Sequence, residues 1–141
     1  MKRYVYAMAI TKKAAISNIQ SISLPLIEHL LKIYMFPNSD YRVHWSKEVT
    51  AFLNRVPRLK SNNKLIGYKV VREAVSVYED QIDSIIKTLL KEYRDLDSER
   101  SNPIEAQQYV SEYLDWICTQ VCEGESISSY DVMDKLEEIG F

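Results

Sequence analysis

The sequence predicts an all-α protein: a compact bundle of five to six helices, with one long helix as its spine, in a single domain spanning residues 1–141. A chain of 141 residues suits one domain. With only three glycines and four prolines, it has little of the turn chemistry that connects strands. Apolar residues recur at helical spacings along most of the chain, which favours helices packed in a bundle.

The N-terminal residues 3–21 fit one helix or a broken pair of helices. Residues 3–10, RYVYAMAI, also fit a strand, because tyrosine and valine favour pleated surfaces. The apolar run is short and stops at Lys12 and Lys13, so we do not expect a secretory signal peptide. This part of the chain is therefore predicted as helix, with strand as the alternative.

A central helix is predicted over residues 23–36. Ser23 suits its N-cap, Pro25 suits its first turn, and Pro37 stops it. Apolar side chains surround the axis on most sides, which indicates a nearly buried helix. They are Leu26, Ile27, Leu30, Leu31, Ile33, Tyr34 and Phe36.

The next predicted helix has an apolar stripe that begins at Trp45 and ends at Val56, just before Pro57. A polar connector, residues 58–64, leads from it into the longest predicted element, residues 65–95. We expect this element to be the spine, with a bend near Gly67. Its apolar seam is regular enough for bundle packing or self-association. The seam consists of Val71, Val75, Tyr78, Ile82, Ile85 and Leu89.

Capping signals mark the last two helices. Asn102 suits an N-cap, with Pro103 at the first helical position and Glu105 at the third. Ser128 and Asp131 form a second capping box. We therefore expect one helix to begin at Pro103 and a short final one to begin after Ser128 and to stop at glycine 140.

Charge is divided between the two halves of the chain. Residues 1–72 hold 13 basic and 3 acidic residues, a net of +10, whereas residues 73–141 hold 5 and 17, a net of −12, which together give the overall −2. From Val49 to Arg72 there is no carboxylate. Such asymmetry is typical of proteins that bind nucleic acid or a charged partner.

The positive segment is the candidate partner-binding site. Its residues can pair with an acidic protein surface or with phosphates, or they can cover the solvent face and pair with acidic helices of the same chain. Nucleic acid ranks second, because no helix-turn-helix signature is evident and the acidic half would repel phosphate. The candidate residues are Arg55, Arg58, Lys60, Lys64, Lys69 and Arg72.

The acidic half supports the converse hypothesis, in which exposed carboxylates attract a basic protein partner, as immunity proteins and antitoxins do. Solvated helix faces are the simpler interpretation. The candidate carboxylates are Glu79, Asp80 and Asp83 on one predicted helix, and Asp131, Asp134, Glu137 and Glu138 on another.

Catalytic and metal-binding patterns are scarce. Cys118 and Cys122 lie four residues apart on a predicted helix, where we expect reduced thiols. With His29 and His44 they could supply four zinc ligands, but the spacing matches no standard finger. We expect no cofactor, metal or membrane span, and a cytoplasmic location. An enzyme with an unrecognised site near His29 or Cys118 is the third hypothesis, after a non-catalytic binder of a protein partner and a nucleic-acid-binding protein.

Residues 27–49 resemble a segment of the bacterial domain-of-unknown-function family twenty-nine. The resemblance rests on a His-Leu-Leu-Lys run, a proline shortly after it and a tryptophan early in the next helix. In this chain they are His29, Leu30, Leu31, Lys32, Pro37 and Trp45. The chain departs from the family in lacking its acidic first helix and in a shorter connector after Trp45. The resemblance implies an all-helical bundle and no assigned activity.

Overall fold

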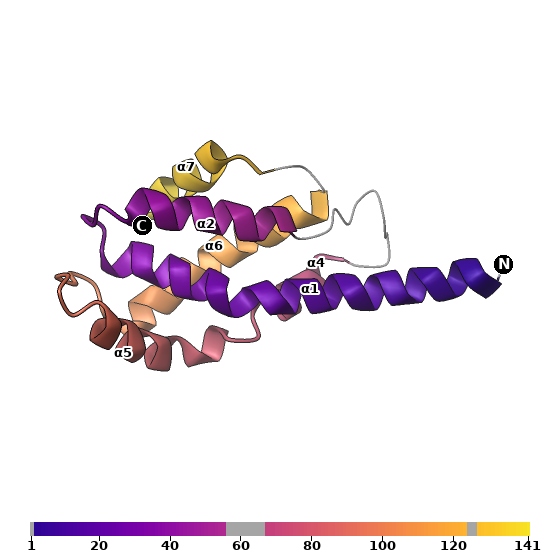
Figure 1. Ribbon diagram of the computed structural model, residues 1–141, viewed down its shortest axis with the longest axis horizontal. Coiled ribbons are helices and arrows are strands. Elements are labelled where there is room, and N and C mark those ends of the chain that lie inside the picture. Colours follow the sequence, from indigo (N-terminus) through magenta and orange to yellow (C-terminus); the bar gives the residue numbers. More distant parts are fainter. Residues whose placement is uncertain (1, 56–66, 124–126) are drawn as a thin grey trace.

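The computed structural model describes residues 2–55, 67–123 and 127–141 (Figure 1). Within these ranges the chain forms six α-helices and one 3-10 turn, and no strand, which confirms the predicted all-α bundle. The elements are α1 (Lys2–Met35), α2 (Arg42–Arg55), α4 (Tyr68–Val75), η1 (Glu79–Gln81), α5 (Ile82–Glu92), α6 (Pro103–Glu123) and α7 (Ser129–Ile139).

Helix α1 is the spine of the bundle. It runs for 34 residues without a break, so the strand alternative for residues 3–10 and the predicted helix start at Ser23 are both wrong. Pro25 lies inside the helix, where a missing N–H costs up to about 3 kcal/mol. Complete burial of Leu26 and its neighbours on the following turns offsets that cost.

The predicted spine over residues 65–95 is also wrong as a single helix. Helix α4 ends at Val75, where the N–H of Ser76 bonds the carbonyl of Glu73 at 3.3 Å in a tightened last turn. The N–H of Glu79 then bonds the carbonyl of Ser76 at 2.9 Å, and α5 starts only at Ile82. The two short helices still bury the predicted seam except for Tyr78, which lies between them and is half-buried.

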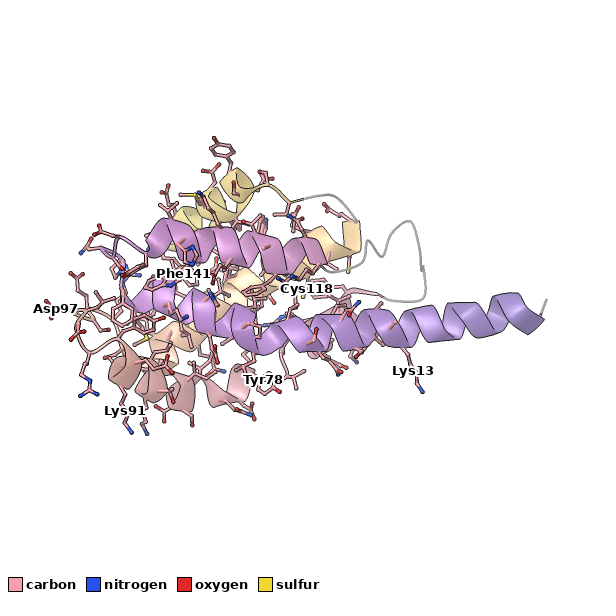
Figure 2. All side chains as sticks on the ribbon, in the orientation of Figure 1. Lys13, Tyr78, Lys91, Asp97, Cys118 and Phe141 are labelled. Atoms are coloured by element: carbon pink, nitrogen blue, oxygen red, sulfur yellow. The ribbon has the colours of Figure 1, made fainter. Side chains whose placement is uncertain are left out.

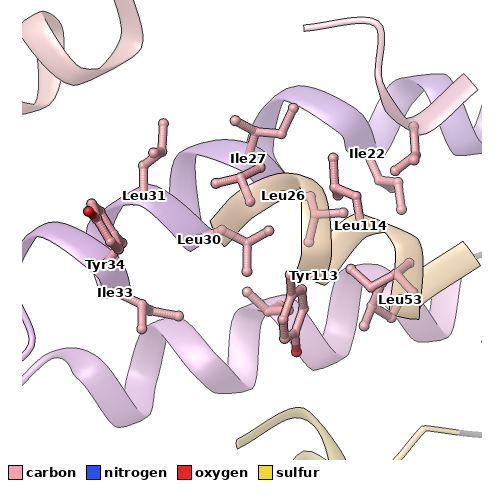
Figure 3. Close-up of a cluster of buried hydrophobic side chains, with 14 of the residues drawn as sticks. Ile22, Leu26, Ile27, Leu30, Leu31, Ile33, Tyr34, Leu53, Tyr113 and Leu114 are labelled. Atoms are coloured by element: carbon pink, nitrogen blue, oxygen red, sulfur yellow. The ribbon is translucent and has the colours of Figure 1, made fainter. Parts of the chain in front are cut away.

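The core lies where the C-terminal half of α1 meets α2 and α6. Leu30 of α1, Leu53 of α2 and Leu114 of α6 are buried in one cluster (Figure 3). Tyr113 of α6 is also fully buried there, and its hydroxyl donates to the carbonyl of Val132 at 3.1 Å. This bond connects α6 to α7 through the middle of the protein.

Both predicted N-caps are confirmed. The Asn102 side chain accepts from the N–H groups of Ile104 and Glu105, and Ser128 and Asp131 form a reciprocal capping box. Gly140 ends α7 with a φ of 116°, a conformation that other residues rarely adopt. Within the described ranges, no helix is long and apolar enough to cross a membrane.

Candidate interaction surfaces

Arg72, the last member of the predicted basic site, lies inside an internal network. Its Nε donates to Asp115 Oδ1 at 2.7 Å, and its Nη2 donates to Glu79 Oε1 and to Ser111 Oγ, each at 3.0 Å. The guanidinium also bonds the Ser76 hydroxyl. Only 17% of the side chain is exposed. Through these bonds Arg72 joins α4 to α6 and to the start of η1.

The electrostatics of this network fix the charge of Arg72. Burial by itself lowers the pKa of the guanidinium, but hydrogen bonds to Asp115 and Glu79 outweigh burial and raise it above the ordinary value. Arg72 is therefore a permanent cation whose fork of donors matches nearby carboxylates. Its charge is satisfied by the acidic half of the same chain, as the internal-pairing alternative predicts.

The structure describes only two of the other members of the basic site. Arg55 and Lys69 are exposed, and the Arg55 guanidinium lies 5.5 Å from the ring centroid of Phe52. Arg58, Lys60 and Lys64 lie outside the described residues. The described part of the site thus presents two basic side chains to solvent, Arg55 and Lys69.

His29 serves to join α1 to α2. Its Nδ1 lies 2.7 Å from the carbonyl oxygen of Pro25, and its Nε2 contacts Glu48. Glu48 also pairs with Nε2 of His44 at 2.8 Å, while the His29 ring packs edge-on against Phe52. Both ring nitrogens of this buried imidazole contact groups of the protein, so His29 links the two helices.

The cysteines lie in surroundings that suppress their reactivity. Burial raises the pKa of the Cys118 thiol to about 12, so it stays protonated at neutral pH. Cys122 is half-buried, and burial raises its pKa as well. Across the described part of the chain, no three His, Cys, Asp or Glu side chains gather as metal ligands. The zinc hypothesis therefore has no support from the residues in view.

An acidic surface covers α6 and α7. From residue 101 to the C-terminus the sequence has nine acidic residues and one basic residue, Lys135, a net of −8. Every carboxylate that the structure describes on the two helices is exposed. We call the following residues the acidic surface: Glu105, Glu112, Asp115, Glu123, Asp131, Asp134, Glu137 and Glu138.

Few of these charges are used inside the fold. Asp115 holds Arg72, Asp131 caps α7, and Glu138 pairs with Lys135 at 3.1 Å. Among the described residues the other five make no ion pair. In contrast, the predicted acidic residues of η1 and the first turn of α5 are partly engaged, because Glu79 bonds Arg72 and Asp83 pairs with Lys87. The net negative charge is therefore concentrated on α6 and α7, where a single lysine opposes it.

A groove opens within the acidic surface, between the first turns of α6 and the end of α7. Its volume is about 640 Å³. Apolar atoms of Ile104, Tyr109 and Ile139 line it together with the carboxylates of Glu105 and Glu112. Ile104 is 73% exposed, although it begins a helix whose other large aliphatic side chains are buried. We call this feature the Ile104 groove.

Sequence reasoning missed the Ile104 groove. Ile104 is the one signal that was present, because it lies outside the buried stripe that starts at Ala106 and continues at Val110. An aliphatic side chain off the buried face, directly after a proline, indicates an exposed apolar position. That Ile104 and Ile139 line the same groove depends on how α7 packs against α6, which the sequence does not reveal.

A buried hydroxyl lies behind the groove. The ring of Tyr34, at the end of α1, packs 5.1 Å from the ring of Tyr109, and its hydroxyl has no hydrogen-bond partner among the described residues. Burial and then the negative charge of Glu105 raise the pKa of Tyr34 to about 12. Arg100 covers the same two rings, 5.1 Å from the Tyr34 centroid. Tyr109, which lines the groove, is therefore backed by a second aromatic ring.

Comparisons with protein-family models, curated proteins and solved structures find no match to this chain. The resemblance of residues 27–49 to the domain-of-unknown-function family stays a prediction.

Proposed function

We propose that this chain is a non-catalytic cytoplasmic protein that binds a basic protein partner through a charged helical surface, the acidic surface of α6 and α7. The observation that carries the proposal is the exposure of every described carboxylate on these helices, opposed by a single lysine. A field of one sign speeds the encounter with an oppositely charged protein and disfavours wrong partners.

Two features favour binding over catalysis. His29 and Cys118, the side chains closest to catalytic chemistry, are both buried, and His29 is engaged at both ring nitrogens. The acidic surface, in contrast, combines open charge with an exposed aliphatic side chain, Ile104. Binding surfaces commonly pair an apolar centre with a charged rim.

Charge reversal tests the proposal. Tagged protein is purified at low salt from cells that express it, and the co-purifying protein is measured for its rate of association. We expect Glu112→Lys with Glu137→Lys to slow association at least about tenfold, because electrostatic steering is lost. The matched control is Asp80→Lys with Glu92→Lys, which makes the same change of charge at exposed positions outside α6 and α7 and leaves most of the rate intact.

The runner-up function gives a different outcome in the same experiment. If the exposed basic side chains Arg55 and Lys69 bind nucleic acid, the co-purifying material is RNA or DNA, and its affinity falls steeply with salt. Arg55→Ala with Lys69→Ala then releases it, whereas reversal of Glu112 and Glu137 strengthens it. That result would show that the protein acts through the basic segment and not through the acidic surface.

A further inference from the structure

The N-terminal part of α1 extends away from the bundle. Figure 1 shows that it passes beyond the ends of all the other described helices, and Figure 2 shows Lys13 on this extension, with its side chain directed away from the bundle. The remainder of α1 lies against α2, α4, α5 and α6. One end of the longest helix therefore projects from the bundle.

We call residues 2–13 the extension. Its sequence is basic and apolar. Lys2, Arg3, Lys12 and Lys13 flank the apolar run YVYAMAI, and the first carboxylate of the chain is Glu28. An isolated helix of this length is marginal in water, and aromatic and β-branched residues make it weaker still. The extension is therefore best stabilised as a helix by contact with an acidic surface that also offers apolar atoms.

The Ile104 groove offers this combination. It has exposed apolar atoms from Ile104 and Ile139, with the carboxylates of Glu105 and Glu112 beside them. A second hollow of about 450 Å³ continues along α6 and shares Ile104 and Glu112. Together the two hollows follow the outer face of α6, which suits an elongated occupant such as a helix.

The extension cannot reach the groove of its own molecule. Tyr34, near the last residue of α1, packs against Tyr109 at the base of the groove. Ile10 lies earlier in the same unbroken helix, so at 1.5 Å per residue the extension is about 36 Å from Tyr34. A straight helix cannot fold back over that distance, and only the extension of another molecule can enter the groove.

We infer that the occupant of the Ile104 groove is a second copy of this chain, whose basic N-terminal helical extension docks along the acidic face of α6. The inference deepens the proposed function, because it rests on the same acidic surface and names one partner for it. The contact joins different surfaces of the two copies, so it is head-to-tail and produces a ring or an open chain of molecules.

Exchange of charges across the contact provides the test. One variant, Lys2→Glu, Arg3→Glu, Lys12→Glu and Lys13→Glu together, reverses the four charges of the extension, and the other, Glu105→Lys with Glu112→Lys, reverses the groove. Sedimentation velocity measures the association of the purified full chain as its concentration is raised. We expect the wild type to associate and each variant alone to associate at least about tenfold more weakly, because like charges then face each other.

A mixture of the two variants should associate again, because every extension then meets a groove of opposite charge. Circular dichroism establishes that both variants keep their helices. The inference is overturned if the wild type stays monomeric, if either variant associates as well as the wild type, or if the mixture does not recover. If self-association fails while reversal of Glu105 and Glu112 still releases a basic co-purifying protein, the proposed function stands without the second copy.

Discussion

Arg72→Ala is expected to lower the free energy of unfolding by about 2–3 kcal/mol, because charged hydrogen bonds between helices are lost and two carboxylates are left without their partner. The network connects α4 with α6 and with Glu79 at the start of η1. The value is placed below that of a fully buried pair, because Asp115 is 56% exposed and water screens its charge.

Urea denaturation followed by circular dichroism measures this loss. Lys69→Ala is the matched control, because it removes an exposed basic side chain three residues before Arg72. It should change the free energy of unfolding by less than about 0.5 kcal/mol. Arg72→Lys should recover only part of the loss, since an ammonium cannot reproduce the guanidinium fork. Equal stability of the alanine variant and the wild type would show that the network does not hold α4 in place.

Tyr113→Ala is expected to be the most damaging single substitution at an aromatic position, with a loss of about 3–5 kcal/mol from the cavity that it opens. The ring is completely buried and packs against Trp116 and Phe141. The same side chain holds α7, because its hydroxyl donates to the carbonyl of Val132. Loss of Tyr113 should therefore loosen the two helices that carry the acidic surface.

Tyr113→Phe separates packing from hydrogen bonding. It keeps the ring and removes only the bond from the hydroxyl to the carbonyl of Val132, so the expected loss is only about 1–2 kcal/mol. Thermal and urea unfolding of both variants measure the difference. If phenylalanine were as damaging as alanine, the hydroxyl rather than the ring would carry the stability of this region.

Local signals in the sequence were sufficient for the caps of α6 and α7. Asn102, Ser128 and Asp131 act on backbone groups within three residues, so their roles depend on nothing distant. The buried face of α6 also has a regular helical spacing of apolar residues, from Ala106 through Val110 and Leu114 to Val121. The local sequence is therefore sufficient to predict these parts of the fold.

Ser23 shows why the start of α1 was predicted wrongly, as the start of a central helix over residues 23–36. A serine two residues before a proline is typical of a helix start, but here its hydroxyl is buried and donates at 2.5 Å to the carbonyl of Val75. Val75 ends α4, and its carbonyl is one of those left without a partner inside a helix. The side chain therefore serves the end of another helix 52 residues away, which local pattern cannot reveal.

The break between α4 and α5 was also not predicted. No glycine or proline occurs between Val75 and Ile82, and the apolar spacing continues across the break, so the sequence indicates one helix. Side-chain bonds from Arg72 to Ser76 and Glu79 hold the turn that separates the two helices. These two contacts are local, whereas the bond from Arg72 to Asp115, 43 residues away, is what takes this predicted cation off the surface.

Carboxylate footprinting tests most directly the central claim that the acidic surface is the binding surface. Exposed Asp and Glu side chains are labelled by a carbodiimide and an amine, with and without the bound partner, and each site is quantified by mass spectrometry. We predict that labelling of Glu105, Glu112 and Glu137 falls severalfold in the complex while Asp80 and Glu92 are unchanged. Unchanged labelling of all three on α6 and α7 in a complex that demonstrably forms would contradict the account.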